Sequence, residues 1–153
     1  MSRVRIGIAG AGGLGKHHAR ILSARDDTQI VALFDTDPVA MNRLEKSLGV
    51  SVQGLNHYSS LSAMIDSDKL DGLVIATPHT RHADQVRTGL EAGLHVLVEK
   101  PMATTTRDAR DFIGESCYDK IQEIQEKLLY NAGQTSIERL RFVSSITMTP
   151  FLD

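Results

Sequence analysis

The sequence predicts an α/β protein with a doubly wound parallel sheet, followed by a short C-terminal helix and strand that would be the remnant of a second domain. Three observations lead to this fold class. Short apolar runs alternate with amphipathic stretches up to about residue 113, which is typical of a parallel sheet covered by helices on both faces. A glycine-rich turn follows the first apolar run, and the composition becomes more helical and polar after about residue 114.

The individual elements follow from hydrophobic periodicity and from residues that start or stop helices. The apolar runs predict strands at residues 4–9, 30–34, 50–53, 73–76 and 94–98, of which 50–53 is the weakest. The amphipathic stretches predict helices at about residues 13–24, 38–48, 61–65, 80–92 and 104–113. Asp37 and Pro38 suit the first turn of their helix, as cap and first helical residue. Gly93 suits the C-terminal cap of the helix that precedes it.

A glycine motif at the end of the first predicted strand carries the strongest chemical signal. It reads Gly10-Ala11-Gly12-Gly13-Leu14-Gly15, which is G-x-G-x-x-G between a strand and a helix. Gly10 permits the tight turn, Gly12 lets the backbone approach a pyrophosphate, and Gly15 lets helix and strand pack closely. Gly13 and Leu14 complete the turn, where the helix N-terminus attracts phosphate groups. The motif indicates a Rossmann fold that binds a dinucleotide; a merely tight turn is the alternative.

An acidic residue at the end of the second predicted strand favours NAD as the dinucleotide. Asp35 lies about twenty residues beyond Gly15, where a carboxylate can accept hydrogen bonds from the adenosine ribose hydroxyls. A 2′-phosphate would be repelled by Asp35, and neither Thr36 nor Asp37 supplies an arginine to neutralise it. NADP is therefore less favoured. The alternative is a solvated carboxylate at the end of a strand.

Two further segments make the sequence resemble a known family. Ala76-Thr77-Pro78-His79-Thr80-Arg81-His82 follows the fourth predicted strand, and Glu99-Lys100-Pro101 follows the fifth. With the glycine motif and Asp35, these segments resemble the Gfo/Idh/MocA family of oxidoreductases over about residues 3–113. The resemblance implies that Thr77, Pro78 and His82 lie along the cofactor, near its ribose and nicotinamide. It also implies that Glu99 and Lys100 stand where cofactor and substrate meet, and that a cis bond can precede Pro101.

Lys100 is the predicted catalytic residue. An ammonium beside the reacting carbon can polarise a carbonyl or stabilise an alkoxide, and its counterpart in the family does similar work. The alternative is that Lys100 only pairs with Glu99 or with a carbonyl at the sheet end. The resemblance implies an NAD-dependent dehydrogenase that moves hydride between nicotinamide and a secondary alcohol of a sugar-like or polyol substrate.

Composition excludes several other classes of function. The chain has 153 residues, a net charge of −2 and one cysteine, Cys117, so nucleic-acid and membrane partners are not indicated and a cytoplasmic location is expected. His79 and His82 share an i, i+3 spacing, yet no cysteine or carboxylate completes a ligand set, so no metal site is predicted. His17 and His18 open the first predicted helix, where packing or solvation is the expected role.

The C-terminal part is expected to be incomplete. We divide the chain into a dinucleotide-binding domain at residues 1–115 and a remnant of a substrate and oligomerisation domain at 116–153. Apolar residues at helical spacing follow Tyr118, and an alternating pattern predicts a strand from about Arg139 to Met148. That strand should dock on the chain's own sheet or on another copy's, giving a homo-oligomer in the second case. Because the family's Asp-x-x-x-His cluster does not occur here, a catalytically incomplete dinucleotide-binding protein, acting as sensor or partner subunit, is the alternative function.

Overall fold

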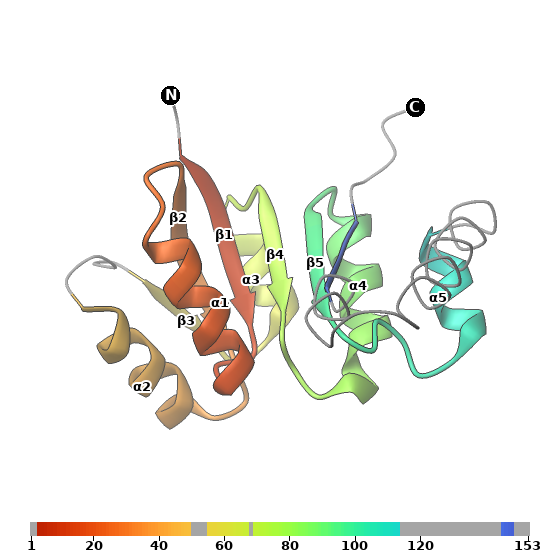
Figure 1. The fold of residues 1–153 in the computed structure, drawn as a ribbon, viewed down its shortest axis with the longest axis horizontal. Coiled ribbons are helices and arrows are strands. Elements are labelled where there is room, and N and C mark those ends of the chain that lie inside the picture. Colours follow the sequence, from red (N-terminus) through yellow and green to blue (C-terminus); the bar gives the residue numbers. More distant parts are fainter. Residues whose placement is uncertain (1–2, 50–54, 68, 114–144, 149–153) are drawn as a thin grey trace, which may run out of the picture.

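A six-stranded sheet forms the centre of the described part of the chain (Figure 1). The computed structural model describes residues 3–49, 55–67, 69–113 and the backbone of 145–148. The strands are β1 (Val4–Ala9), β2 (Thr28–Phe34), β3 (Asn56–Tyr58), β4 (Gly72–Ile75), β5 (His95–Glu99) and β6 (Ser145–Met148). Their order across the sheet is β3-β2-β1-β4-β5-β6. Strands β1 to β5 run parallel, and β6 runs antiparallel to β5.

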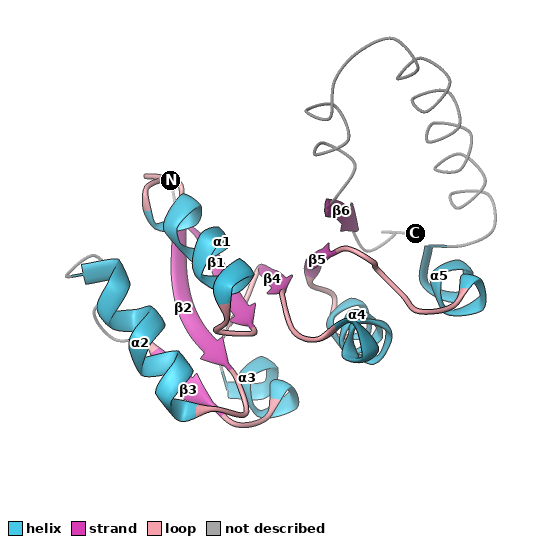
Figure 2. Cartoon of the chain, turned by 60° about the horizontal axis from the view of Figure 1, so that its bottom comes forward, coloured by secondary structure: helices cyan, strands magenta, loops and turns pink. Residues whose placement is uncertain are grey.

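Helices cover both faces of this sheet, as the doubly wound prediction requires. They are α1 (Gly13–Ser23), α2 (Pro38–Leu48), α3 (Leu61–Ser67), α4 (His82–Glu91) and α5 (Thr106–Ile113), with a 3-10 helix, η2 (His79–Arg81), directly before α4. Helices α1 and α2 lie on one face, and α3 and α4 lie on the other (Figure 2). Helix α5 packs against α4.

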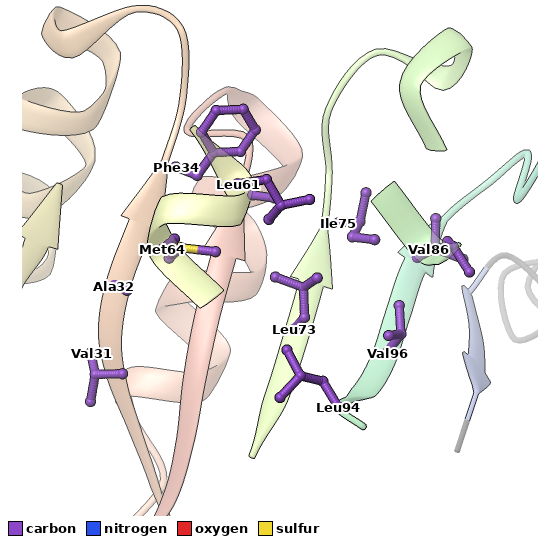
Figure 3. Packing of buried hydrophobic residues seen from close by; sticks show 12 residues of the cluster. Val31, Ala32, Phe34, Leu61, Met64, Leu73, Ile75, Val86, Leu94 and Val96 are labelled. Carbon is purple, nitrogen blue, oxygen red and sulfur yellow. The ribbon is translucent and has the colours of Figure 1, made fainter. Parts of the chain in front are cut away.

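Each face of the sheet has its own buried apolar cluster. On one face, Ile8 and Leu33 of the sheet pack with Leu44 of α2. On the other face, strand residues pack with Met64 of α3 and Val86 of α4 (Figure 3). Apolar side chains on both faces of the central strands are the reason that these strands read as continuous apolar runs rather than as alternating ones.

The strand order creates a point where the chain changes direction across the sheet. From β1 the chain proceeds outward to β2 and β3, and it then returns to place β4 on the other side of β1. The crossovers after β1 and β4 therefore leave the carboxyl edge of the sheet in opposite directions. Open α/β sheets bind ligands at this edge, at the point where the strand order reverses.

Most elements agree with the predicted ones, and the differences have physical causes. Strand β2 begins at Thr28 rather than at residue 30, because Thr28 pairs with Val4 of β1. The weak strand predicted at 50–53 lies outside the described residues, and the strand that pairs with the end of β2 is Asn56–Tyr58. The helix predicted from residue 80 starts instead as the 3-10 turn η2 and becomes α-helical at His82.

The predicted C-terminal strand is present in part. Ser145–Met148 forms β6 and pairs with Val96–Glu99 of the chain's own sheet. The remainder of the predicted strand, the predicted helix after Tyr118, and Cys117 lie outside the described residues. Pairing with β6 gives β5 a neighbour on its outer side, so β5 is not an edge strand.

Candidate dinucleotide-binding site

The glycine turn between β1 and α1 is packed too tightly for side chains at two of its positions. Gly10 has a φ of +99°, and a Cβ there would lie 2.5 Å from the carbonyl oxygen of Ala76. A Cβ on Gly15 would lie 1.8 Å from the carbonyl oxygen of Gly10. The turn is also held to β2, because the Gly10 N–H donates to the Phe34 carbonyl at 2.8 Å. The backbone itself therefore requires glycine at positions 10 and 15, in keeping with the tight turn and the close packing expected of them.

The middle of the same turn is open. A Cβ at Gly12 or Gly13 would meet no atom within 4 Å, so the fold alone does not require glycine there. Gly12 is the N-cap of α1 and provides no side-chain hydrogen bond to the helix. The first N–H groups of a helix have no partner within it, and they form an anion site when they face a ligand. The next residue, Leu14, is 51% exposed.

Asp35 is fixed beside this turn by two backbone hydrogen bonds. Its Oδ2 accepts the Ala11 N–H at 2.7 Å, and its Oδ1 accepts the Asp37 N–H at 2.9 Å. Each carboxylate oxygen has a second lone pair, so the group can still accept hydrogen bonds from a ligand hydroxyl. Asp35 thus supports the glycine turn in addition to its predicted role toward ribose.

A groove of about 960 Å³ brings most of the predicted residues together. This volume lies at the upper end of the range of about 300–1,000 Å³ that is usual for ligand sites. Its lining consists of Gly10, Gly12, Gly13, Leu14, Phe34, Asp35, Thr36, Ala76, Thr77, Pro78, Arg81 and Gln85. The glycine turn, the end of β2 and the segment after β4 therefore face one space. An uncapped helix N-terminus and a carboxylate on the same groove fit the phosphates and the ribose of a dinucleotide.

Two polar residues in this lining were not singled out from the sequence. Arg81 ends η2, and Gln85 lies four residues later on α4. The Thr77 hydroxyl donates to the Gln85 amide oxygen at 2.5 Å, which leaves the amide NH₂ of Gln85 as a donor. A sequence signal did exist: polar residues at i, i+4 spacing directly after Thr77-Pro78 lie on one side of the helix that begins there.

His82 joins the two family-like segments instead of lining the groove. It is 1% exposed. Its Nδ1 lies 2.7 Å from the Pro101 carbonyl oxygen, and its Nε2 lies 2.8 Å from the Thr77 carbonyl oxygen. Carbonyl oxygens only accept hydrogen bonds, so a neutral ring can donate to one of them and a doubly protonated ring to both. His82 therefore does not line the groove itself, but it supports the groove by contacting the backbone carbonyl of Thr77, a residue that does line it.

Glu99 and Lys100 stand at the carboxyl end of β5. Glu99 is buried, whereas Lys100 is exposed, and the Lys100–Pro101 peptide bond is cis. Among the described residues the Lys100 ammonium makes no hydrogen bond or ion pair, so it is not paired with Glu99. The Glu99 carboxylate instead lies 2.7 Å from the Nε2 of His18 on α1. This contact was missed in the sequence, where a histidine on a helix and a carboxylate on a distant strand give no common signal.

Metal-ligand clusters and membrane-spanning helices are both absent from the described residues. They contain no group of three or more His, Cys, Asp or Glu side chains placed to hold a metal ion. None of the helices in this part of the chain is both long enough and apolar enough to cross a membrane.

The chain is similar in sequence and in structure to several known proteins. The rhizopine catabolism protein MocA of Rhizobium meliloti is 36% identical over 110 residues, covering 72% of this chain and 33% of that protein. The inositol 2-dehydrogenase of Rhizobium meliloti is 30% identical, covering 82% and 35%. The WlbA dehydrogenase of Chromobacterium violaceum, solved with NADH and UDP-GlcNAcA, is similar with a TM-score of 0.67 and 27% identity, covering 78% and 33%.

The chain thus spans about a third of the length of the curated relatives that it matches. Residues 4–116 match the family model for GFO_IDH_MocA, an oxidoreductase family with an NAD-binding Rossmann fold. The residues that match the family model include the glycine turn, Asp35 and both family-like segments. This chain therefore belongs to the Gfo/Idh/MocA oxidoreductase family and has its NAD-binding Rossmann fold.

Proposed function

We propose that the groove binds NAD, with the pyrophosphate at the N-terminus of α1 and the adenosine ribose on Asp35. The observation that carries this proposal is the shared groove, in which the open positions Gly12 and Gly13 lie with Asp35 and Thr77. The absent side chains at Gly12 and Gly13 let phosphate oxygens approach backbone N–H groups closely. Leu14 and Pro78 supply apolar surface on the same groove.

NAD is preferred over NADP in this proposal because of the charge on Asp35. A carboxylate that accepts hydrogen bonds from ribose hydroxyls would repel a phosphate at the 2′ position. Arg81 is a cation in the groove, but it enters from η2 and not from the residues that follow Asp35. The family match and the NADH in the WlbA dehydrogenase support a nicotinamide dinucleotide.

The reaction that we propose is the reversible oxidation of a secondary alcohol on a sugar or polyol. Bound NAD would supply the hydride acceptor. In the direction of oxidation the alcohol would release its O–H proton to water and its hydride to NAD, and Lys100 would hydrogen-bond to the reacting oxygen and stabilise the alkoxide that precedes hydride departure; in the reverse direction it would polarise the carbonyl. Glu99 is buried and accepts the Lys100 N–H, and His82 contacts the carbonyl oxygens of Pro101 and Thr77, so both would hold the adjoining backbone. The substrate class is supported by the inositol 2-dehydrogenase relative, and the division into units at 1–115 and 116–153 remains part of the proposal.

Replacement of Lys100 by alanine tests the catalytic assignment. We expect Lys100→Ala to bind NADH as the wild type does, because Lys100 does not line the groove, and to lose about a hundredfold or more of its turnover. Binding is measured by NADH fluorescence. Turnover is measured as NAD reduction at a panel of inositols and aldoses. Lys46→Ala, which removes an exposed lysine from the last turn of α2, is the matched control and should retain both properties.

The outcomes separate the parts of the proposal. Failure to bind NADH would overturn the cofactor assignment. Turnover that persists in Lys100→Ala would overturn the role of Lys100. Binding without turnover in the wild type would support the alternative of a dinucleotide-binding protein that acts as sensor or partner subunit.

A further inference from the structure

A buried chain of contacts leads from helix α1 to the backbone of Lys100. The Nε2 of His18 lies 2.7 Å from the Oε1 of Glu99, and the side chains are 16% and 9% exposed. The other oxygen of Glu99, Oε2, accepts the backbone N–H of Lys100 at 3.3 Å. An ionised carboxylate can only accept, so the facing nitrogen of His18 carries the proton in this contact. Both oxygens of Glu99 therefore have a donor.

This chain of contacts matters because, among the described residues, no hydrogen bond or ion pair holds the Lys100 side chain directly. Lys100 is exposed, and within the described ranges its ammonium has no hydrogen-bond or ion-pair partner. The direction in which its side chain leaves the sheet is therefore set by its backbone. Glu99 holds that backbone at the Lys100 N–H, while His82 holds the next residue at the Pro101 carbonyl, 2.7 Å from Nδ1.

His18 is also well placed to relate Lys100 to the cofactor site. It belongs to the same helix whose N-terminus, at Gly12 and Gly13, lies on the groove. A helix is a rigid unit over this short distance, so a contact with its second turn fixes Glu99 relative to the glycine turn. Removing His18 would leave the Oε1 of this buried carboxylate without a donor, which favours rearrangement of the group.

We propose that His18 is a positioning residue, which acts through Glu99 to hold Lys100 at a set place relative to the glycine turn. The proposal deepens the function proposed for this groove and rests on it. His18 is not among the residues that line the groove. Its loss should therefore affect the reaction step much more than the binding of NADH.

Three variants and two measurements test this proposal. His18→Ala should change the dissociation constant for NADH by no more than about threefold and lower kcat about tenfold or more. His18→Gln should recover part of kcat, because its amide NH₂ can donate to Glu99. Arg20→Ala is the control, since Arg20 is an exposed residue of the same helix, and it should leave both constants unchanged. His17 is not used as the control because its ring packs edge to face on that of His18, with the centroids 6.0 Å apart.

The second measurement does not depend on turnover. Hydrogen exchange of the Lys100 backbone N–H, followed by NMR, should become about tenfold faster or more in His18→Ala while the N–H of Val98 within β5 keeps its rate. Unchanged exchange at Lys100, or full kcat in His18→Ala, would overturn the proposal. A wild type that binds no NADH would overturn the proposed function instead, and the exchange rates would still decide the role of His18.

Discussion

Gly15→Ala should unfold at a much lower urea concentration than the wild type. The added Cβ would lie 1.8 Å from the carbonyl oxygen of Gly10 and 2.9 Å from its carbonyl carbon. Both are backbone atoms, so no side-chain rotation can relieve the overlap. Helix α1 would have to move away from β1, and we expect a loss of about 3 kcal/mol or more in the free energy of unfolding. Urea titration followed by circular dichroism measures this loss.

Gly13→Ala is the matched control for this prediction. A Cβ at Gly13 would meet no atom within 4 Å, and alanine has the higher helix propensity, so the free energy of unfolding should not fall. Equal stability of the two variants would contradict the packing role that we assign to Gly15. NADH titration of Gly13→Ala then reports on the cofactor site alone, because its fold is intact.

Asp35→Ala should lose much of its affinity for NADH and most of its discrimination against NADPH. A hydrogen bond to a charged group contributes about 1.5–3 kcal/mol, so the loss of the ribose contact should weaken NADH binding by roughly tenfold to a hundredfold. The substitution also removes the acceptor for Ala11 and Asp37, which hold the turn. The ratio of the NADH and NADPH dissociation constants is therefore the decisive quantity, since a general loosening of the turn weakens both ligands.

Asp37→Ala is the control for Asp35→Ala, because it removes a carboxylate close to Asp35 in the sequence. The Asp37 side chain caps α2 by accepting the Val39 N–H at 2.8 Å, and loss of such a cap costs about 1 kcal/mol of stability. We expect the ratio of the NADH and NADPH dissociation constants to stay at its wild-type value in this variant. A ratio that is unchanged in Asp35→Ala as well would mean that Asp35 does not select the cofactor.

The fold could be predicted from the sequence because its strongest signals are local. Buried parallel strands give continuous apolar runs, and residues such as Asp37 and Gly93 act on the helix ends beside them: Asp37 caps α2, and Gly93 takes a φ of +75° after α4. Strand β3 was harder, because its three residues, Asn56–Tyr58, include no apolar run and become a strand only by pairing with β2. Such pairing between distant segments leaves no local pattern.

In the candidate site, too, some features follow from local sequence signals and others depend on contacts between distant residues. The glycine turn and Asp35 lie in one short strand-helix-strand segment with characteristic spacing, so the sequence indicates their proximity. The contact between His18 and Glu99 joins residues 81 positions apart, and it depends on how α1 crosses the sheet. The burial of His82 likewise depends on two carbonyl groups, at Thr77 and Pro101, that come together only in the folded chain.

The hydrogen bonds that hold the glycine turn also bear on how a dinucleotide would enter. The Gly10 N–H donates to the Phe34 carbonyl and the Ala11 N–H donates to the Asp35 carboxylate, so residues of the chain itself hold the turn. Ordering a flexible residue costs about 1–2 kcal/mol of conformational entropy, and here folding has already ordered these residues. The turn is preorganised, so association should resemble docking onto a rigid surface, with little need for the loop to close around its ligand.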